Sequence, residues 1–262
     1  MTTGVLPVWW DAAADGPTNM AADELLAEEA DRRGSPVVRL YSWSTPTVSL
    51  GGFQRLAEAE SAAEIAGLPL VRRPSGGGAI IHGTDLTYAT AVPRGHPWGR
   101  TPQPLYDAFH AAMVEVLREL GFDAHLHTPS AEDPPADALF CFSRRSLGDV
   151  VVGRPNSPIA AATKVMGSAQ RRLGTTVLQH GSLLLASCPA VCGEARHDGL
   201  AEIGCGRKDW TGQTVADRWL SRVAAAFGIV RKDMTEPFAE RHATEIARRG
   251  HRFRDPQWTG RR

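Results

Sequence analysis

The chain has 262 residues, of which 42% are hydrophobic and 22% charged, and its formal net charge is zero. This composition is that of an ordinary globular protein with enough chain to bury a core. The neutral charge argues against non-specific binding to nucleic acid or to a membrane surface. Residues 1–11 lack the basic and apolar regions of a secretory signal, and the apolar runs are too short to cross a bilayer, so we expect a cytoplasmic location.

In the first half of the chain, β-branched and aromatic residues predict strands at residues 9–10, 37–43, 47–53, 68–71, 79–82 and 86–92. A helix is predicted to follow a cap at Thr18 or Asn19 and to end at Gly34, and a shorter helix covers 56–66. Asp23 and Glu24 are expected to be charges that complement the dipole of the first helix rather than acid/base groups.

In the second half, Thr101 followed by a proline predicts the start of a helix that ends at Gly121. Residues 147–152 and 164–170 are typical of a hairpin, joined by a long segment, 153–163, that we expect to be a mobile surface insertion. A strand at 176–185, a helix around 215–227 and a last helix at 237–249, capped by Thr235, complete the prediction. The hairpins and the irregular mixture of elements favour an α+β fold, which we expect to form a single domain over residues 1–262.

The most informative segment is Arg72-Arg73-Pro74-Ser75-Gly76-Gly77-Gly78. Consecutive glycines let the backbone approach a ligand, and their N–H groups can form a concave site for an anion or a carbonyl oxygen. The two arginines are expected to offset a phosphate or carboxylate charge. The segment matches neither common phosphate-binding glycine motif, and a flexible turn between strands is the alternative.

Lys164 begins a predicted strand that also carries Gly167 and Ser168, and such small residues permit close approach of a ligand. A lysine directed into such a cleft can polarise an acyl carbonyl or hold a phosphate, although a lysine at a strand start is usually a solvated charge. His180 interrupts an apolar strand and is expected to be a core histidine or to face the same cleft, and His82 follows the glycine segment.

Four cysteines are present, and without a secretion signal we expect no disulfide framework. Cys141 lies between aromatic residues, where a core thiol is the usual role, and as a nucleophile it would need a nearby cation from Arg144, Arg145 or Lys164. The other three are expected to be loop and core residues rather than metal ligands, because structural zinc sites have tighter spacings than those of Cys188, Cys192, His197 and Cys205.

Taken together, these segments resemble the family of lipoate–protein ligases and octanoyl or lipoyl transferases, which shares its type of catalytic domain with biotin–protein ligases. The resemblance covers nearly the whole chain. It rests on residues 19–24 (NMAADE), 43–51 (WSTPTVSLG), 72–79 (RRPSGGGA) with His82, 149–152 (DVVV), 164–171 (KVMGSAQR), 178–182 (LQHGS) and 255–258 (DPQW).

The resemblance implies a central mixed, largely antiparallel sheet flanked by helices. It implies that the residues lining the substrate site are Arg73, Ser75, Gly76, Gly77, Gly78, His82, Gly167, Ser168, Ala169 and His180. It also implies that Lys164 contacts the reacting acyl group, and that Cys141 holds the position of the nucleophile in one transferase branch. Two arginines, Arg144 and Arg145, follow this cysteine where the family pattern does not expect them.

For this family, the acceptor is a lysine on a lipoyl domain, such as glycine-cleavage H protein or a dehydrogenase E2 subunit. The transferase interpretation needs no cofactor and takes the acyl group from acyl carrier protein or from another lipoyl domain. The ligase interpretation needs ATP and Mg²⁺ and leaves Cys141 as a core residue. A non-catalytic protein that only binds an acyl group or cofactor is a further alternative.

Overall fold

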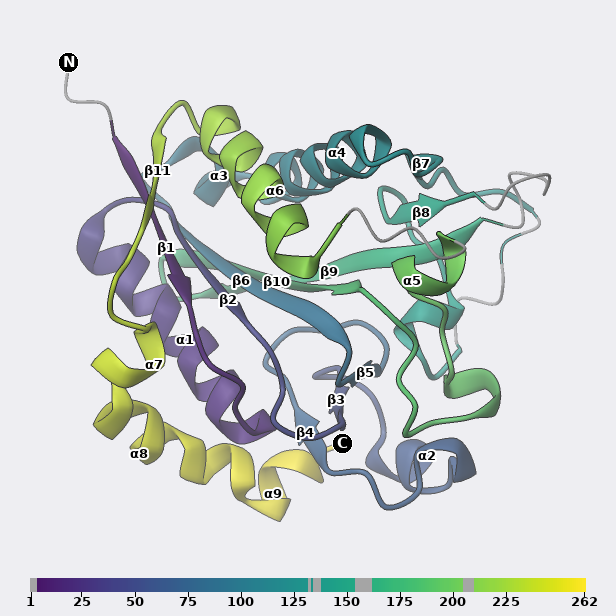
Figure 1. Cartoon of the computed structure of the whole chain (residues 1–262). Coiled ribbons are helices and arrows are strands. Elements are labelled where there is room, and N and C mark those ends of the chain that lie inside the picture. The colour runs from purple at the N-terminus through teal and green to yellow at the C-terminus, as the bar shows by residue number, and fades with distance from the viewer. Residues whose placement is uncertain (1–3, 132, 134–137, 154–161, 205–209) are drawn as a thin grey trace.

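The computed structural model describes the chain apart from residues 1–3, 132, 134–137, 154–161 and 205–209. The strands of its large sheet are β1 (Val5–Trp10), β2 (Val37–Tyr41), β6 (Asp85–Pro93), β7 (Ala124–Leu126), β8 (Val150–Val152), β9 (Thr163–Leu173), β10 (Thr176–Leu184) and β11 (Val230–Asp233). Within the described residues this sheet has eight strands in the order β11-β1-β2-β6-β10-β9-β8-β7 (Figure 1). β1 pairs in parallel with β2 and β11, and the other neighbours are antiparallel. The expected α+β fold with a mixed, mainly antiparallel sheet is confirmed.

Helices cover both faces of this sheet. They are α1 (Gly16–Arg33), α2 (Leu56–Glu60), α3 (Pro97–Arg100), α4 (Gln103–Glu119), α5 (Leu200–Ile203), α6 (Gly212–Ala226), α7 (Phe238–Arg241), α8 (Ala243–Arg254) and α9 (Pro256–Thr259). Figure 1 shows α4 and α6 on one face and α1 with α8 on the other. None of the helices in the described part of the chain is both long and apolar enough to span a membrane.

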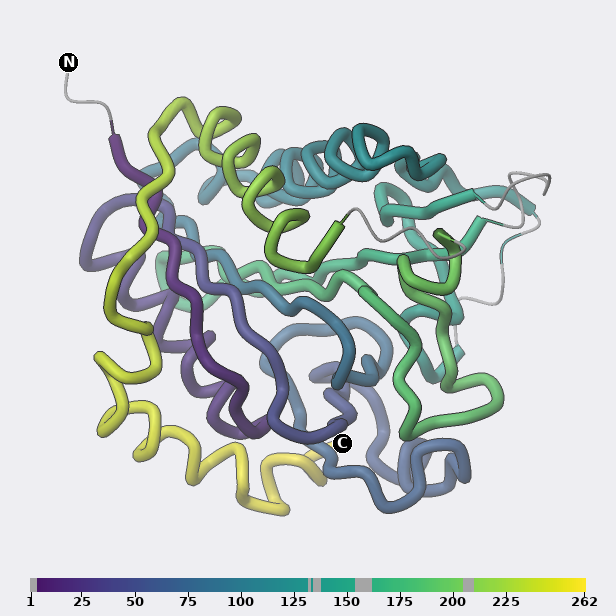
Figure 2. The backbone as a smooth tube through the Cα atoms, viewed as in Figure 1, coloured from purple at the N-terminus to yellow at the C-terminus, as the bar shows by residue number. Residues whose placement is uncertain are grey.

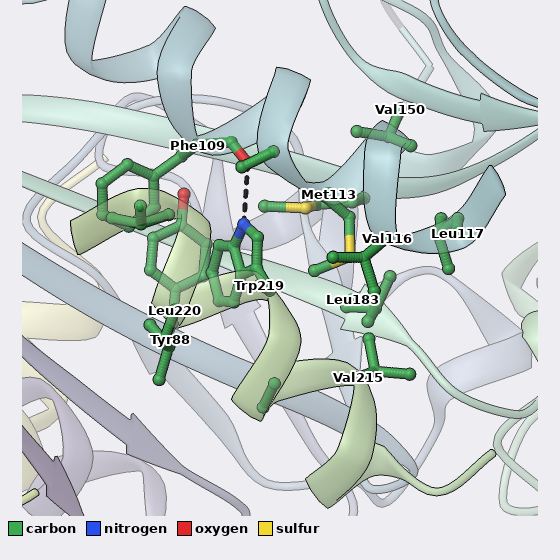
Figure 3. Packing of buried hydrophobic residues seen from close by; sticks show 14 of the residues in the cluster. Tyr88, Phe109, Met113, Val116, Leu117, Val150, Leu183, Val215, Trp219 and Leu220 are labelled. Carbon is green, nitrogen blue, oxygen red and sulfur yellow. Dashed lines mark hydrogen bonds between the residues drawn. The ribbon is translucent and has the colours of Figure 1, made fainter. Parts of the chain in front are cut away.

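The alternation of side chains along each strand divides the core into two halves. On β1, Val8 faces the cluster under α4 and α6, and the next residue, Trp9, faces the cluster under α1. Trp219 of α6 lies at the centre of the first cluster, edge-on to the ring of Tyr88, and its indole N–H donates to the Phe109 carbonyl at 2.8 Å (Figure 3).

A second sheet of three strands lies beside the large one. Its strands are β3 (Thr47–Leu50), β4 (Leu70–Arg72) and β5 (Ile80–His82), in the order β4-β3-β5. The chain passes from β5 through a short turn at Gly83 into β6 of the large sheet. The two sheets also approach each other at the glycine segment between β4 and β5, where Ser75 contacts His180 of β10.

The first helix begins earlier than predicted. The carboxylate of Asp15 accepts a hydrogen bond from the N–H of Thr18 at 2.8 Å, and Pro17 lies in the first turn. The prediction of a cap at Thr18 or Asn19 is therefore wrong. Gly34 ends the helix as predicted, with a φ of 66° that glycine adopts without strain.

The last predicted helix is in fact two helices, α7 and α8. The backbone leaves helical geometry at His242, with φ −115° and ψ 20°, so the helical pattern of the sequence is interrupted there. The N-cap of α7 is Pro237 and not Thr235. A similar division separates α2 from a 3₁₀ turn over Ala63–Ile65, where one helix over 56–66 was predicted.

The predicted hairpin is confirmed, because β8 pairs antiparallel with β9. Residues 154–161 of the predicted mobile insertion lie outside the described residues. The start of α4 is displaced by one residue, with Pro102 rather than Thr101 as its N-cap. Strands β7 and β11 were not predicted, since each is short and β11 is mostly exposed.

The C-terminal segment lies against the first helix, as the yellow and purple parts of the tube in Figure 2 show. Arg249 of α8 forms an ion pair with Glu28 of α1 at 2.7 Å, and Arg252 pairs with Glu24. Beyond α8, the indole N–H of Trp258 donates to the Arg72 carbonyl at 2.9 Å. The two ion pairs hold α8 against α1, and the Trp258 hydrogen bond holds the end of the chain against β4, the strand that leads into the glycine segment.

His110 is a fully buried histidine on α4. Its Nδ1 lies 2.7 Å from the Gly148 carbonyl oxygen and its Nε2 lies 2.6 Å from Ser168 Oγ, while the Tyr106 ring covers it at 3.9 Å. Burial lowers the pKa of His110 to about 4, although the Gly148 carbonyl and the Asp149 carboxylate favour the charged form. The imidazole is therefore neutral at physiological pH.

We expect Trp219→Ala to lower the free energy of unfolding by about 3–5 kcal/mol, because it leaves a cavity in the core and removes the donor to the Phe109 carbonyl. Urea denaturation would measure this. Val230→Ala is the control, since Val230 is 57% exposed and its truncation should change the free energy by less than about 0.5 kcal/mol. Equal losses in the two variants would contradict the assignment of Trp219 to the core.

We also expect His110→Gln to change the pH dependence of stability. The neutral form of His110 stabilises the folded protein fully above about pH 6.5, and this stabilisation is lost as the pH falls toward 4, because only the unfolded chain then binds the proton. The difference in free energy of unfolding between wild type and variant should therefore shift by up to about 3 kcal/mol over this range. His251→Gln, at an exposed histidine of α8, should follow the wild-type profile. Parallel profiles for wild type and His110→Gln would overturn the expectation.

Candidate active site

A narrow pocket lies between the two sheets. Most of the site residues predicted from the sequence line it: Arg73, Gly77, His82, Cys141, Gly167, Ser168, Ala169 and His180. Other walls are apolar or aromatic, among them Met20, Trp43 and Ile80. Lys164 and Gly78 instead line an adjoining outer cleft, and Ser75 and Gly76 line a hollow on the far side of the glycine segment.

The glycine segment forms a tight turn between β4 and β5. Gly77 has a φ of 93°, a conformation that other residues rarely adopt. The carbonyls of Gly76 and Gly78 both accept hydrogen bonds from Arg73, at 2.9 and 2.7 Å. Within the described part of the chain, the N–H groups of these three glycines donate to no other protein group. The turn therefore offers backbone donors of the kind that stabilise a developing oxyanion.

Both arginines before the turn bond to main-chain carbonyls. Arg73 donates to the Ser49 carbonyl at 2.6 Å as well as to the turn, and burial lowers its pKa to about 10. Arg72 donates to the carbonyls of Gly51 at 2.8 Å and of Thr259 at 2.7 Å. These bonds hold the turn in place, and the expectation that the two arginines offset a phosphate or carboxylate charge stays a prediction.

Cys141 is half-buried and begins a 3₁₀ turn over Cys141–Ser143. Its N–H donates to the Ala79 carbonyl at 2.7 Å, and the Ala79 N–H donates to the Leu139 carbonyl at 2.9 Å. Because Ala79 directly follows the glycine turn, these two main-chain bonds fix the cysteine beside it. Cys141 packs against the small cluster of Ile80, Phe142 and Leu184, and it also lines both the pocket and the outer cleft.

Lys164 lies at the start of β9 and its ammonium group is buried, with the residue 4% exposed. Its Nζ is 2.8 Å from Asp149 Oδ2 and 3.5 Å from Cys141 Sγ, and it donates to the Cys141 carbonyl at 3.2 Å. Burial opposes the charge of Lys164, but Cys141 and Asp149 outweigh burial and raise its pKa. Lys164 is therefore a fixed cation beside the sulfur.

Asp149 belongs to one of the segments that resemble the family, but it was not predicted to be a site residue. It accepts hydrogen bonds from the Tyr106 hydroxyl at 3.0 Å and from the Ser146 N–H at 2.6 Å, besides its ion pair with Lys164. The register of the β8–β9 hairpin shifts between Val150 and Val151, which gives Asp149 its place opposite the lysine. The sequence did contain a signal for this role: Asp149 directly precedes the strand that pairs with the strand of Lys164.

Gly167 leaves room for the lysine. A Cβ atom at this position would lie 2.7 Å from Lys164 Cε and 3.0 Å from its Nζ. Even an alanine would push the ammonium away from the sulfur. Its neighbours Ser168 and Ala169 continue along β9 into the pocket wall.

His180 connects the glycine segment to the first helix. Its Nε2 contacts Ser75 Oγ in a short hydrogen bond, and its Nδ1 lies 3.0 Å from Asp23 Oδ2. Asp23 is fully buried, and it also forms an ion pair with Arg39 at 2.9 Å. The expectation that Asp23 is a charge complementing the helix dipole is therefore wrong, because Asp23 lies beyond the first turn of α1 and tertiary packing brings it to β2 and β10.

His82 forms a second buried network at the other side of the pocket. Its Nδ1 lies 2.8 Å from Asp85 Oδ2, its Nε2 lies 2.8 Å from Ser49 Oγ, and its ring stacks on Trp43 at 3.9 Å. Burial opposes the charge of Asp85, but His82 and neighbouring hydroxyl groups outweigh burial and hold the pKa of this carboxyl at about 2. The stacked His82 ring thus forms a rigid wall of the pocket.

The outer cleft joins the pocket at Cys141 and Ser168, which line both. Its remaining lining includes the exposed side chain of Leu147 and the two arginines that follow the cysteine. Arg145 donates to the Ala162 carbonyl at 2.6 Å, and the Arg144 guanidinium lies against Gly78. Lys164, one of the three cations considered for Cys141, has its Nζ 3.5 Å from the sulfur.

The cysteine and histidine spacing considered for zinc includes Cys205, which lies outside the described residues. Over the residues that the structure does describe, no group of three or more histidine, cysteine or acidic side chains is arranged to hold a metal ion. Cys188 is buried, and Cys192 is exposed. His197 packs against the rings of Phe140 and Phe142.

Comparison with known proteins agrees with the geometry of this site. The family described as lipoyl protein ligase A/B catalytic domain matches residues 15–198, a span that includes Cys141 and Lys164. The octanoyltransferase LipM of Geobacillus kaustophilus is 37% identical over 177 residues, which cover 64% of this chain and 60% of that protein. LipM of Staphylococcus aureus is 35% identical over 177 residues, 63% of this chain and 60% of that protein. The chain thus aligns with only about 60% of the length of these curated relatives.

Solved structures with a similar fold are more distant in sequence. Protein Ta0514 of T. acidophilum, solved with bound lipoic acid, superposes with a TM-score of 0.73 at 18% identity, covering 99% of this chain and all of that one. Lipoate-protein ligase A bound with ATP gives a TM-score of 0.70 at 17% identity, covering 98% of this chain and 99% of that one. At such identities these structures establish the fold alone. Because the family match spans well over half of the sequence, the chain belongs to the lipoyl protein ligase A/B catalytic domain family.

Proposed function

We propose that this protein transfers an octanoyl group from a carrier thioester to a lysine of a lipoyl domain, through a thioester on Cys141. The observation that carries the proposal is the Lys164 ammonium 3.5 Å from the Cys141 sulfur, at the junction of the pocket and the outer cleft. The similarity to LipM octanoyltransferases supports octanoate as the acyl group. Acyl carrier protein is the proposed donor, and glycine-cleavage H protein or a dehydrogenase E2 subunit is the proposed acceptor.

In the first half-reaction, the Cys141 sulfur attacks the carbonyl carbon of the donor thioester. A new C–S bond forms, the bond to the carrier sulfur breaks, and the proton of the Cys141 thiol leaves with the carrier thiol. The negative charge on the carbonyl oxygen is stabilised by the free N–H groups of the glycine turn and by Lys164. One such donor contributes about 2.7–4 kcal/mol to transition-state stabilisation in well-studied enzymes.

Lys164 acts in this proposal as a cation and not as a base. Its raised pKa keeps the ammonium charged, and Asp149 fixes its position at 2.8 Å. A charged group next to the sulfur favours the thiolate, which is the nucleophilic form of cysteine. Removal of Asp149 would leave this buried charge uncompensated.

The mainly apolar lining of the pocket supports an acyl chain as its occupant. Its walls include Met20, Trp43, Ile80 and Ala169. The polar groups in the wall, such as His82 and His180, are already bonded to Asp85 and to Asp23. An apolar chain can therefore enter without leaving these side chains unpaired.

The alternative is a ligase that first forms an acyl-adenylate from ATP and a free acid. Both chemistries occur on this fold, since a related structure contains ATP. The two differ in what they consume: the ligase releases pyrophosphate and needs Mg²⁺, and the transferase needs neither. An assay with octanoyl carrier protein, and separately with free lipoate plus ATP, would distinguish them.

We expect the wild-type protein to gain one octanoyl adduct when it is incubated with octanoyl carrier protein without ATP, as measured by intact mass. Cys141→Ala should gain none. Cys192→Ala, at the exposed cysteine, should gain the adduct at the wild-type rate. Lys164→Ala should slow formation of the adduct by roughly 100-fold, because it removes the cation beside the sulfur. An adduct on Cys141→Ala at the wild-type rate, or pyrophosphate release with free lipoate, would count against the transferase.

We expect Gly167→Ala to separate stability from activity. The new methyl group displaces the end of Lys164 and disturbs its ion pair with Asp149, so the melting temperature should fall by a few degrees while the protein still folds. Acylation of Cys141 should fall by at least about 10-fold, because the ammonium no longer reaches the sulfur. Ala169→Gly, two residues along the same strand, is the control and should keep more of the acylation rate. Full acylation by Gly167→Ala would show that the position of the lysine is unimportant.

A further inference from the structure

Ser168 lies where the two parts of the site meet. It is half-buried, and it lines the acyl pocket and the outer cleft together with Cys141. Its hydroxyl group lies 2.6 Å from His110 Nε2 and 2.7 Å from the Tyr88 hydroxyl. The direction of these hydrogen bonds determines what Ser168 can offer to a second substrate.

His110 fixes the hydrogen of Ser168. The Gly148 carbonyl 2.7 Å from Nδ1 can only accept, so Nδ1 carries the proton of the neutral ring and Nε2 presents a lone pair. Ser168 must therefore donate its hydrogen to Nε2. The charged groups that act on His110 are Asp149 and Asp107, which favour its charged form, and Lys164, which opposes it, and burial keeps the imidazole neutral among them.

Tyr88 extends this network. Since the hydrogen of Ser168 is used, Tyr88 donates its own hydrogen to Ser168 Oγ. The Tyr88 oxygen in turn accepts from Gln179 Nε2 at 2.7 Å, and Gln179 Oε1 accepts from Gln170 Nε2 at 2.7 Å. Gln170 Nε2 also donates to the Pro102 carbonyl at 2.8 Å. In this series Ser168 Oγ accepts one hydrogen bond, from Tyr88, and keeps one lone pair unused by these partners.

The opposite strand leaves room for this arrangement. Gly181 of β10 pairs with Ser168 on one side and with Tyr88 on the other. A Cβ atom at Gly181 would meet Ser168 Oγ and would lie 2.7 Å from Tyr88 Cε1. A side chain at this position would displace the hydroxyl group.

We propose that Ser168, held by His110 as a hydrogen-bond acceptor, binds and orients the primary amine that attacks the Cys141 thioester. The remaining lone pair of Ser168 receives one N–H of the amine, whose nitrogen attacks the acyl carbon. An amide C–N bond forms, the C–S bond breaks, and one amine proton passes to the Cys141 sulfur. This inference rests on the proposed acyl-enzyme and adds the group that receives the second substrate.

Three variants test the proposal. Ser168→Ala removes the acceptor. His110→Asn keeps a donor toward the Gly148 carbonyl but loses the acceptor for Ser168, so the serine hydrogen is free to turn toward the amine. His110→Gln instead can place its amide oxygen where Nε2 lay, and it should rescue the direction of the bond.

The experiment measures two rates by intact mass: acylation of Cys141 by octanoyl carrier protein, and loss of the acyl group from the loaded enzyme to an apo lipoyl domain of an E2 subunit. We expect the ratio of transfer to acylation to fall by at least about 10-fold in Ser168→Ala and in His110→Asn, and to recover in His110→Gln. The same fall should appear with ethylamine as acceptor, because Ser168 contacts the amine rather than the surface of the acceptor protein.

The outcomes separate this inference from the proposed function. A wild-type protein that never becomes acylated on Cys141 would overturn the proposed function and with it the acyl-enzyme that the amine attacks. Normal acylation with an unchanged ratio in Ser168→Ala would overturn the role of Ser168 alone. A defect confined to the lipoyl domain and absent with ethylamine would also overturn it, because the serine would then act in protein docking.

Discussion

The burial of one ammonium group, that of Lys164, determines most of the site. A charge withdrawn from water is costly unless it is paired and fully hydrogen-bonded. Asp149 provides the countercharge at 2.8 Å, and the Cys141 carbonyl accepts another hydrogen bond from the ammonium. The requirements of the lysine thus bring β8, β9 and the cysteine turn together, and the sulfur lies next to the cation as a result.

Local features were predictable from the sequence where they depend on neighbouring residues. Gly34 ends the first helix because its φ is positive, and the β8–β9 hairpin follows from two extended runs. The order of the glycine segment, Cys141 and Lys164 along the chain indicated a common site, and the structure brings them together. The assignment of roles to these residues, and of one domain to the whole chain, stays a prediction.

Features that depend on distant residues could not be predicted. His180 contacts Ser75 and Asp23, which lie 105 and 157 positions away, and no local pattern encodes such a triad. Asp23 has the sequence context of a solvated helical charge, but the fold buries it against Arg39. His110 is a polar residue among the mainly apolar buried residues of α4. It belongs to the site because Ser168, which is distant in the sequence, contacts its ring.

The main-chain bonds between Cys141 and Ala79 have a consequence for variation in the sequence. The sulfur is positioned relative to the glycine amides by backbone atoms, which every residue type possesses. Side chains after the cysteine can therefore change without altering the register of nucleophile and amides. Arg144 and Arg145, which depart from the family pattern, follow this turn and line the outer cleft. Main-chain atoms determine where the sulfur lies relative to the glycine amides, whereas side chains determine the charge of the outer cleft. The two properties can therefore vary separately.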